Sequence, residues 1–291
     1  MSSVFFLTGS SRGLGRAIAE AALDGGHRLV ATARDPRSLD DLVATHGDRI
    51  LALALDVTDS DAAQTAIAAA VEHFGRIDVV VNNAGYADLA AVEDVTLEDF
   101  RRQIGTNFFG VVNVTKAALP ILREQGAGHI IQVSSIGGRL ATPGLSAYQS
   151  AKWAVGGFSS VLAAEVNPLG IRVTVLEPGG METDWAGSSM QVPPVSEPYR
   201  QTVGASAAIH NSAAVALGDP VKVAQVVLQI AAMDEPPLRL ILGSEAYAYA
   251  TAAARAQAAS DERFKQLTTS TDRDDATDAQ RDPLGVGAGS R

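Results

Sequence analysis

The amino-acid sequence predicts an α/β fold. Short apolar runs alternate with longer amphipathic stretches along most of the 291 residues, which predicts strands and helices in alternation. The short runs are apolar throughout rather than at every second position, and this is typical of parallel strands covered on both faces. Together these observations predict one Rossmann-type, doubly wound domain, in which helices flank both faces of a seven-stranded parallel sheet.

Seven runs rich in Val, Ile, Leu and Ala are predicted to be the strands. In chain order they are Val4–Thr8, Arg28–Ala33, Ile50–Leu55, Val79–Asn82, Ile130–Ser134, Arg172–Leu176 and Leu238–Leu242. Parallel neighbours need crossover connections, and a strand–helix–strand crossover is right-handed in nearly all proteins. The chain is therefore expected to place its connecting helices on the two faces of the sheet.

Amphipathic stretches between these runs are predicted to be the helices. They are Arg16–Ala22, a helix from Pro36 toward His46, Ser60–Phe74, Leu97–Leu122, Ala147–Val166, a helix from Pro220 to Met233, and Glu245–Leu267 after the last strand. Two of them begin with Asp-Pro, where Asp35 or Asp219 caps the N-terminus and the proline occupies the first turn.

The domain organisation follows from the composition along the chain. No linker interrupts residues 1–245, so they are predicted to form one domain. Within it, residues 184–218 are rich in Ser, Pro and Gly and lack a clean period, which is typical of a lid over a binding site. Residues 246–267 predict a C-terminal helix. Residues 268–291 have almost no large apolar side chains and predict a polar, disordered tail.

Composition excludes several classes of protein. The chain has 23 Lys and Arg against 33 Asp and Glu, a net charge of −10, which does not favour a nucleic-acid partner. The absence of cysteine excludes disulfides, thiolate metal sites and a cysteine nucleophile, and the five histidines show no metal spacing, so no metal is expected. No apolar run approaches the roughly 18–20 residues of a membrane span. The N-terminus does not resemble a signal peptide, so a cytoplasmic location is expected.

A glycine-rich turn follows the first predicted strand. Gly9, Gly13 and Gly15 have the spacing Gly-x-x-x-Gly-x-Gly immediately before a predicted helix. Glycines let the backbone approach a pyrophosphate, whose charge is met by the free N–H groups of the helix N-terminus. An ordinary tight turn could have the same glycines, but the strand before it and the helix after it favour a dinucleotide site.

The end of the second predicted strand bears on the choice of nucleotide. In NAD-binding proteins an acidic residue commonly stands there and contacts the ribose, whereas this chain has Ala33. Arg34 follows it and Arg12 lies in the glycine turn, and two guanidinium groups would suit a 2′-phosphate. Each arginine could also be an ordinary surface charge, and Asp35 is better placed as a helix cap. The cofactor is predicted to be NADP(H).

A tyrosine and a lysine lie four residues apart on a predicted helix. This spacing places Tyr148 and Lys152 on one face. A neighbouring ammonium favours the phenolate and lowers the pKa of a tyrosine, which would let Tyr148 exchange a proton with a carbonyl oxygen. Alone, the pair could be a helix with a surface lysine. Ser135 closes a strand thirteen residues earlier and could hydrogen-bond the substrate oxygen, or merely cap a turn.

Taken together, these motifs resemble the short-chain dehydrogenase/reductase family, in its branch of roughly 250-residue chains. The resemblance extends from Val4 to Gly243 and includes Asn82-Asn83-Ala84-Gly85, Asp56-Val57 and Pro178-Gly179. The sequence as a whole is similar to bacterial 17β-hydroxysteroid and retinol dehydrogenase-like oxidoreductases.

The resemblance implies two sets of site residues. The catalytic residues would be Asn107, Ser135, Tyr148 and Lys152. The cofactor-binding residues would be Gly9, Ser11, Arg12, Gly13, Leu14, Gly15, Arg34, Asp56, Val57, Asn83, Ala84, Gly85, Tyr148, Lys152, Pro178, Gly179 and Thr183. In this family Asp56 would meet the adenine amine, Lys152 would bind the nicotinamide ribose, and Asn107 would help hold a water near that lysine.

The implied activity is NADPH-dependent reduction of a ketone or aldehyde to an alcohol, or the reverse. The alternative is an NADP(H)-sensing binding protein on the same scaffold, although such a protein has no need of all four catalytic residues. Trp185, Met190, Tyr199, Leu140 and Leu145 predict an apolar substrate, unless they only pack the domain. The family also implies a homodimer or homotetramer that pairs through the helices predicted at Leu97–Leu122 and Ala147–Val166.

Overall fold

The computed structural model describes residues 2–181, 190–210 and 217–284, and the chain divides into two compact units, Met1–Ala250 and Thr251–Arg291. The strands are β1 (Val4–Thr8), β2 (Arg28–Ala33), β3 (Ile50–Ala54), β4 (Val79–Asn82), β5 (Gly128–Val133), β6 (Ile171–Pro178) and β7 (Arg239–Leu242). They form one parallel sheet of seven strands in the order β3-β2-β1-β4-β5-β6-β7. The predicted α/β, doubly wound fold is confirmed.

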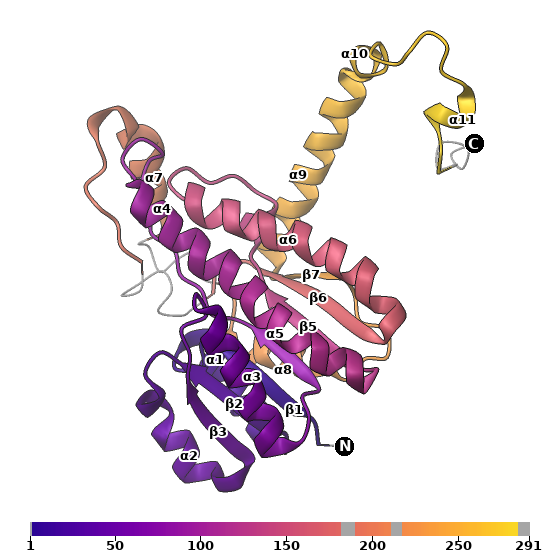
Figure 1. The fold of residues 1–291 in the computed structure, drawn as a ribbon. Coiled ribbons are helices and arrows are strands. Elements are labelled where there is room, and N and C mark those ends of the chain that lie inside the picture. The colour runs from indigo at the N-terminus through magenta and orange to yellow at the C-terminus, as the bar shows by residue number, and fades with distance from the viewer. Residues whose placement is uncertain (1, 182–189, 211–216, 285–291) are drawn as a thin grey trace. The chain divides into compact units, whose positions relative to one another are not determined.

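Helices connect the strands on both faces (Figure 1). They are α1 (Gly13–Asp24), α2 (Asp40–His46), α3 (Ser60–Phe74), α4 (Leu97–Ile104), α5 (Gly110–Gln125), α6 (Ser146–Val166), α7 (Ala205–His210) and α8 (Pro220–Ala231), and α9 (Ser244–Arg263) follows the last strand. Asp59 caps α3, and Asp219 caps α8 before Pro220, because each aspartate accepts two backbone N–H bonds of the first turn. The predicted Asp-Pro start at Asp35 forms a 3-10 turn that leads into α2.

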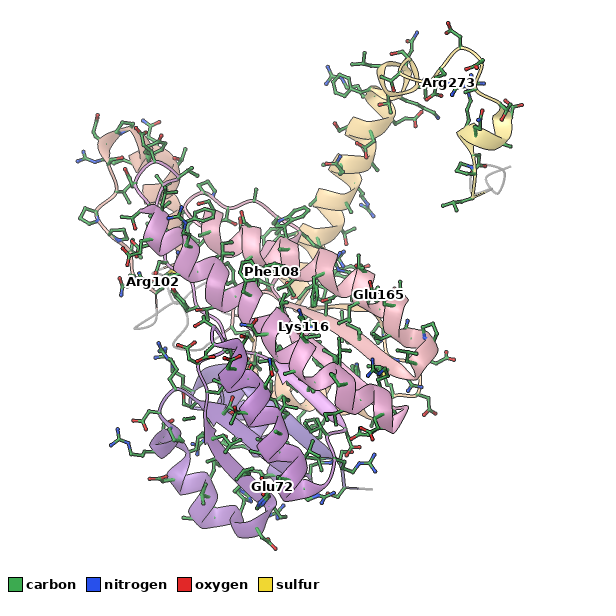
Figure 2. All side chains as sticks on the ribbon, viewed as in Figure 1. Glu72, Arg102, Phe108, Lys116, Glu165 and Arg273 are labelled. Atoms are coloured by element: carbon green, nitrogen blue, oxygen red, sulfur yellow. The ribbon has the colours of Figure 1, made fainter. Side chains whose placement is uncertain are left out.

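The buried side chains form a core on each face of the sheet. Phe5 and Leu7 of β1 pack into one cluster with α1 and α8, whereas Phe6 packs into the other with α3, α5 and α6. Every residue of β1 and β4 is buried, which explains why both strands are apolar up to their last residues, Thr8 and Asn82. The outer faces of α3, α5 and α6 carry exposed charged side chains such as Glu72, Lys116 and Glu165 (Figure 2).

The helix predicted at Leu97–Leu122 is interrupted by a π-helical turn at Gly105–Phe109, between α4 and α5. Phe108 of this turn packs edge-on against Phe158 of α6, with ring centroids 6.2 Å apart. The amide of Asn107 bonds the backbone of another segment, as described below, and this contact holds the turn. π-Turns inside helices often occur at functional sites.

The second unit contains the end of α9 and two short helices, α10 (Lys265–Thr269) and α11 (Asp278–Arg281). Neither helix has a buried residue. A capping box joins Thr277 and Gln280 at the start of α11. The predicted C-terminal helix thus ends at Arg263, and α10 begins within its predicted range. Composition does not predict α11, which rests on local hydrogen bonds rather than on a core.

Candidate active site

The glycine turn joins β1 to α1 at the carboxyl edge of the sheet. Gly9 and Gly13 have positive φ angles of 69° and 54°, a conformation that strains other residues. A Cβ atom on Gly15 would lie 2.0 Å from the carbonyl oxygen of Gly9, so only glycine lets α1 pack this closely on the turn. The spacing of the three glycines is thus explained by the backbone path.

The N-terminus of α1 is open to an anion. Its cap residue, Arg12, makes no side-chain cap bond, and the first turn contains no acidic residue. The first N–H groups of a helix lack intrahelical partners and attract negative charge, so this cradle fits a pyrophosphate. Leu14 is buried beneath the turn, and Ser11 is half-buried within it.

Asn83 attaches the glycine turn to the end of β4. Its side-chain Nδ2 donates to the carbonyl oxygens of Thr8 and Gly9, at 3.0 and 3.1 Å. The backbone N–H groups of Asn83 and Ala84 both donate to Thr8 Oγ1, at 2.9 and 3.0 Å. These bonds hold two of the predicted cofactor segments together at the point where the strand order reverses direction.

Arg12 and Arg34 are both exposed, and neither forms a salt bridge with any residue that the structure describes. Asp35 is engaged elsewhere: its carboxylate lies 2.7 Å from the Arg37 guanidinium and accepts the Arg37 N–H. The bond to Arg37 lowers the pKa of Asp35. The acid next to Arg34 therefore serves as a cap, as the sequence predicts.

Asp56 follows β3 and is fixed by a tight turn. Its Oδ1 accepts bonds from the Thr58 N–H and hydroxyl, at 2.9 and 2.7 Å. These bonds, with a smaller contribution from the positive charge of Arg34, lower the pKa of Asp56. Val57 is buried against Gly110 of α5, where a Cβ would lie 2.5 Å from its Cγ2.

Tyr148 and Lys152 lie on α6 and are both buried. The Lys152 Nζ is 5.5 Å from the centre of the Tyr148 ring and donates to the carbonyl oxygen of Val133, at 2.9 Å. Burial raises the pKa of Tyr148 to about 12 and lowers the pKa of Lys152 to about 8. Desolvation of the phenolate thus outweighs the lowering of the Tyr148 pKa that the sequence predicts from the neighbouring Lys152 ammonium.

Ser135 follows β5 and has two partners. Its side chain hydrogen-bonds Tyr148, and this bond opposes the effect of burial by lowering the pKa of Tyr148. Its Oγ also accepts the N–H of Gly137, at 3.0 Å, and so caps the 3-10 turn Ile136–Gly138. The two interpretations of Ser135 from sequence, site residue and turn cap, therefore describe the same side chain.

Asn107 lies fully buried in the π-helical turn. Its Nδ2 donates to the carbonyl oxygens of Tyr86 and Gln103, at 2.8 and 2.9 Å, and its Oδ1 accepts the Tyr86 N–H at 3.2 Å. A Cβ on Gly85 would lie 2.6 Å from that Oδ1 and 3.6 Å from the Lys152 Nζ. The amide of Asn107 is thus occupied by protein groups, and it positions Gly85 beside Lys152.

The segment after β6 continues the same edge. Pro178 ends the strand and Gly179 donates its N–H to the carbonyl oxygen of Leu242, at 2.9 Å. Thr183 and Trp185 lie outside the described residues. Sequence reasoning missed Glu177, which is fully buried beside Arg139 and Arg239. An acid directly after an apolar run and before Pro-Gly was the available signal, since a buried carboxylate needs a partner.

The described part of the predicted lid packs against the start of α6. Met190 and Val203 belong to an apolar cluster that also contains Leu145 and Tyr148. The lid residue Tyr199 packs against this cluster, and its hydroxyl donates to Glu93 at 2.7 Å. The structure therefore places apolar lid side chains next to the Tyr148 ring.

The described residues show neither a metal site nor a membrane-spanning helix. They contain no group of three or more His, Cys, Asp or Glu side chains arranged to hold a metal ion. Within the same part of the chain, no helix is long and apolar enough to cross a membrane.

Known proteins resemble this chain over most of its length. Residues 3–192 match the family model for short chain dehydrogenases. Oxidoreductase BOA17 of Botryotinia fuckeliana is 57% identical over 270 residues, which cover 92% of this chain and 98% of that protein. The 3-ketodihydrosphingosine reductase of Bacteroides thetaiotaomicron is 33% identical over 242 residues, 82% of this chain and 87% of that protein.

Solved structures have the same fold. A short-chain dehydrogenase from Streptomyces avermitilis is 36% identical, with a TM-score of 0.88 over 94% of this chain and 99% of that one. An alcohol dehydrogenase from Thermococcus sibiricus, complexed with 5-hydroxy-NADP, is 28% identical, with a TM-score of 0.69 over 83% of this chain and 96% of that one. A 3-ketoacyl-(acyl-carrier-protein) reductase from Brucella melitensis, complexed with NADH, is 27% identical, with a TM-score of 0.70 over 82% and 96%. The chain therefore belongs to the short chain dehydrogenase family and is an oxidoreductase of the kind that uses NAD or NADP.

Proposed function

We propose that this protein is an NADPH-dependent carbonyl reductase, which also catalyses the reverse oxidation of the alcohol. The observation that carries the proposal is the buried Tyr148 phenol, hydrogen-bonded to Ser135 and one helical turn from Lys152. This group lies at the same sheet edge as the glycine cradle, where doubly wound proteins bind their ligands.

Each residue of the site has a separate role in the reduction. NADPH held by the glycine turn and Arg34 would supply the hydride that reduces the carbonyl carbon. Tyr148 donates its phenolic proton to the carbonyl oxygen, and Ser135 donates a hydrogen bond to the same oxygen as negative charge develops there. The hydride and the proton together convert the carbonyl to an alcohol, and Tyr148 is left as a phenolate that Lys152 stabilises.

Lys152 can serve more than one partner. One of its three N–H donors is used on the carbonyl oxygen of Val133, which leaves two for a ribose hydroxyl and a water. Because the amide of Asn107 is occupied by Tyr86 and Gln103, the π-helical backbone around it is the part that would hold such a water. This route would return a proton from solvent to Tyr148.

An apolar ketone or aldehyde is the proposed substrate class. Tyr148 belongs to a cluster whose other buried members are all apolar: Ala87, Leu89, Ala91, Leu145, Met190, Val203 and Ala207. A carbonyl presented to Tyr148 would thus have an apolar body beside it. The similarity to a 3-ketodihydrosphingosine reductase, which by its name acts on a ketone, supports this class.

The cofactor proposal rests on Arg34 and Arg12. We expect Arg34→Asp to raise the dissociation constant of NADPH about 10- to 100-fold, because a charge-assisted bond to the 2′-phosphate is lost. NADH, which lacks this phosphate, should bind nearly as before. Fluorescence titration of both nucleotides measures the ratio. Arg37→Asp is the matched control, since Arg37 is an exposed neighbour paired with Asp35. An unchanged ratio in Arg34→Asp would contradict the NADP assignment.

The activity itself is tested by following NADPH absorbance with a panel of steroid, long-chain and aromatic ketones and aldehydes. Turnover of an apolar member, with sugar carbonyls much poorer, is the expected result. Tight NADPH binding without turnover of any carbonyl would instead favour a nucleotide-sensing protein.

A homodimer through α5 and α6 is part of the proposal. Phe109, at the start of α5, and Trp153 and Val161 of α6 are each more than half exposed, and a partner subunit would cover such large apolar side chains. Sedimentation equilibrium is expected to give twice the chain mass of 30.1 kDa. Trp153→Glu should shift the protein toward monomer, whereas a monomeric wild-type protein would refute the pairing.

A further inference from the structure

A buried carboxylate lies between two arginines at the carboxyl end of β6. Glu177 has no exposed surface and stands immediately before Pro178. Its Oε2 accepts a bond from the Arg139 Nε at 2.8 Å, and its Oε1 lies 3.0 Å from the Arg239 Nε. The role proposed above for the site does not use this triad.

Arg139 connects the triad to Ser135. It follows the 3-10 turn that Ser135 caps, and its own N–H donates to the carbonyl oxygen of Ile136 at 2.9 Å. With Ser135 bonded to the Gly137 N–H at one end and Arg139 bonded to Glu177 at the other, this turn is held at both ends. A shift of the Arg139 guanidinium would therefore be transmitted to Ser135 over four residues.

Arg239 connects the triad to the catalytic helix. A Cβ on Gly156 would lie 2.2 Å from its Nη2, so the guanidinium packs directly against the backbone of α6. Gly156 is one turn beyond Lys152 and two turns beyond Tyr148, on the same helix face. Register pairs Arg239 of β7 with Val175 of β6, two residues before Glu177 on the same strand.

Glu177 is thus linked through Arg139 to the turn that Ser135 caps, and through Arg239 to the helix that carries Tyr148. It also directly precedes the Pro178-Gly179 segment. Buried ion pairs add little net stability, because desolvation offsets their attraction, so geometric control is the better explanation for one at this point. We propose that Glu177, with Arg139 and Arg239, is a positioning group that sets Ser135 against Tyr148. The inference rests on the proposed function, in which these two side chains share the carbonyl oxygen.

Glu177→Gln keeps the shape of the side chain and removes its charge. We expect kcat for the carbonyl to fall about 10-fold or more, since small misplacements of reacting groups are costly, with NADPH affinity changed less than about twofold. The alkaline limb of kcat/KM should also move to higher pH, because the Ser135 bond that lowers the pKa of Tyr148 is weakened. Arg139→Lys, which retains the charge, should lose less activity than Arg139→Gln.

Thr174→Val is the matched control for a substitution that lowers stability without disturbing the positions of Ser135 and Tyr148. Thr174 is also buried on β6, where it bonds His129 Nε2 at 2.9 Å and donates to the carbonyl oxygen of Pro237 at 2.8 Å. This variant should lower Tm while kcat and the pH profile stay within about twofold of wild type. If Glu177→Gln fails to fold, Arg139→Gln replaces it in the test, because Arg139 is partly exposed and its loss removes one of the two ion pairs of the triad.

Crystal structures separate this inference from the proposed function. The distance between Ser135 Oγ and Tyr148 Oη is expected to lengthen in Glu177→Gln and to stay unchanged in Thr174→Val. An unchanged distance, or kinetics in Glu177→Gln equal to those of Thr174→Val, would overturn the positioning role. If the wild-type protein reduced no carbonyl, the proposed function would fail, and the measured distance would still decide the role of the triad.

Discussion

Tyr148→Phe is expected to lower kcat for carbonyl reduction at least ~10²-fold, because the variant lacks the group that protonates the carbonyl oxygen. The Phe ring keeps the apolar contacts of Tyr148 with Leu145 and Met190, so the fold should be retained. The dissociation constant of NADPH should change less than about threefold. Steady-state kinetics and fluorescence titration on the same preparation measure the two effects, and Tm shows that the variant is folded.

Tyr199→Phe is the matched control for Tyr148→Phe. It removes the same hydroxyl from a tyrosine that packs on the same apolar cluster but donates to Glu93 instead. Its kcat should remain within about threefold of wild type, because an exposed hydrogen bond is worth little. Turnover of Tyr148→Phe at the wild-type rate would remove Tyr148 from the role of proton donor.

The sheet could be predicted because its signal is local and strong. β4 consists of Val79-Val80-Val81-Asn82, all buried, and such a run has few alternatives to a central strand. The start of α8 was equally predictable, since Asp219 and Pro220 supply the cap and the first turn from adjacent positions.

The break between α4 and α5 could not be predicted in this way. The residues on either side continue one amphipathic pattern, and the π-turn depends on the contact of Asn107 with the backbone of Tyr86, 21 residues earlier. A pattern within one helix cannot reveal a hydrogen bond to another segment. Sequence therefore identified Asn107 as a candidate site residue but did not reveal the π-helical turn in which it lies.

The same distinction applies to the chemistry of the site. Spacing predicted that Tyr148 and Lys152 share a helix face, and they do. Their pKa values depend on burial by the whole domain, and burial raises one and lowers the other. Glu177 was missed because its partner Arg139 lies 38 residues earlier in the chain, and no local motif connects the two.

Lys152→Met is expected to lower kcat by ~10²-fold or more and also to change how stability depends on pH. Burial lowers the pKa of Lys152 from 10.5 to about 8 in the folded protein. Below pH 8 the ammonium is present in both states, and its burial destabilises the fold. Between about pH 8 and 10.5 the folded protein loses this proton while the unfolded chain keeps it, so the free energy of unfolding rises with pH.

Met cannot titrate, so the variant lacks this rise. The free energy of unfolding of Lys152→Met, minus that of wild type, should fall by about 2 to 3 kcal/mol between pH 7 and pH 10. Urea unfolding at fixed protein concentration measures the difference. The pH dependence is the safer test, because Met also leaves the carbonyl oxygen of Val133 without its bond at every pH.

Tyr148 acts in the opposite direction above pH 10, but both proteins contain it, so its contribution cancels in the difference between Lys152→Met and wild type. Burial raises the pKa of Tyr148 from 10.0 to about 12, so its contribution to stability is complete below pH 10 and is lost as the pH rises toward 12. Lys116→Met removes an exposed ammonium from α5 and should change stability by less than about 0.5 kcal/mol. A difference between Lys152→Met and wild type that stays constant from pH 7 to 10 would mean that Lys152 has an ordinary pKa in the fold. The ammonium would then not be desolvated, and its partnership with Tyr148 would have to be mediated by solvent.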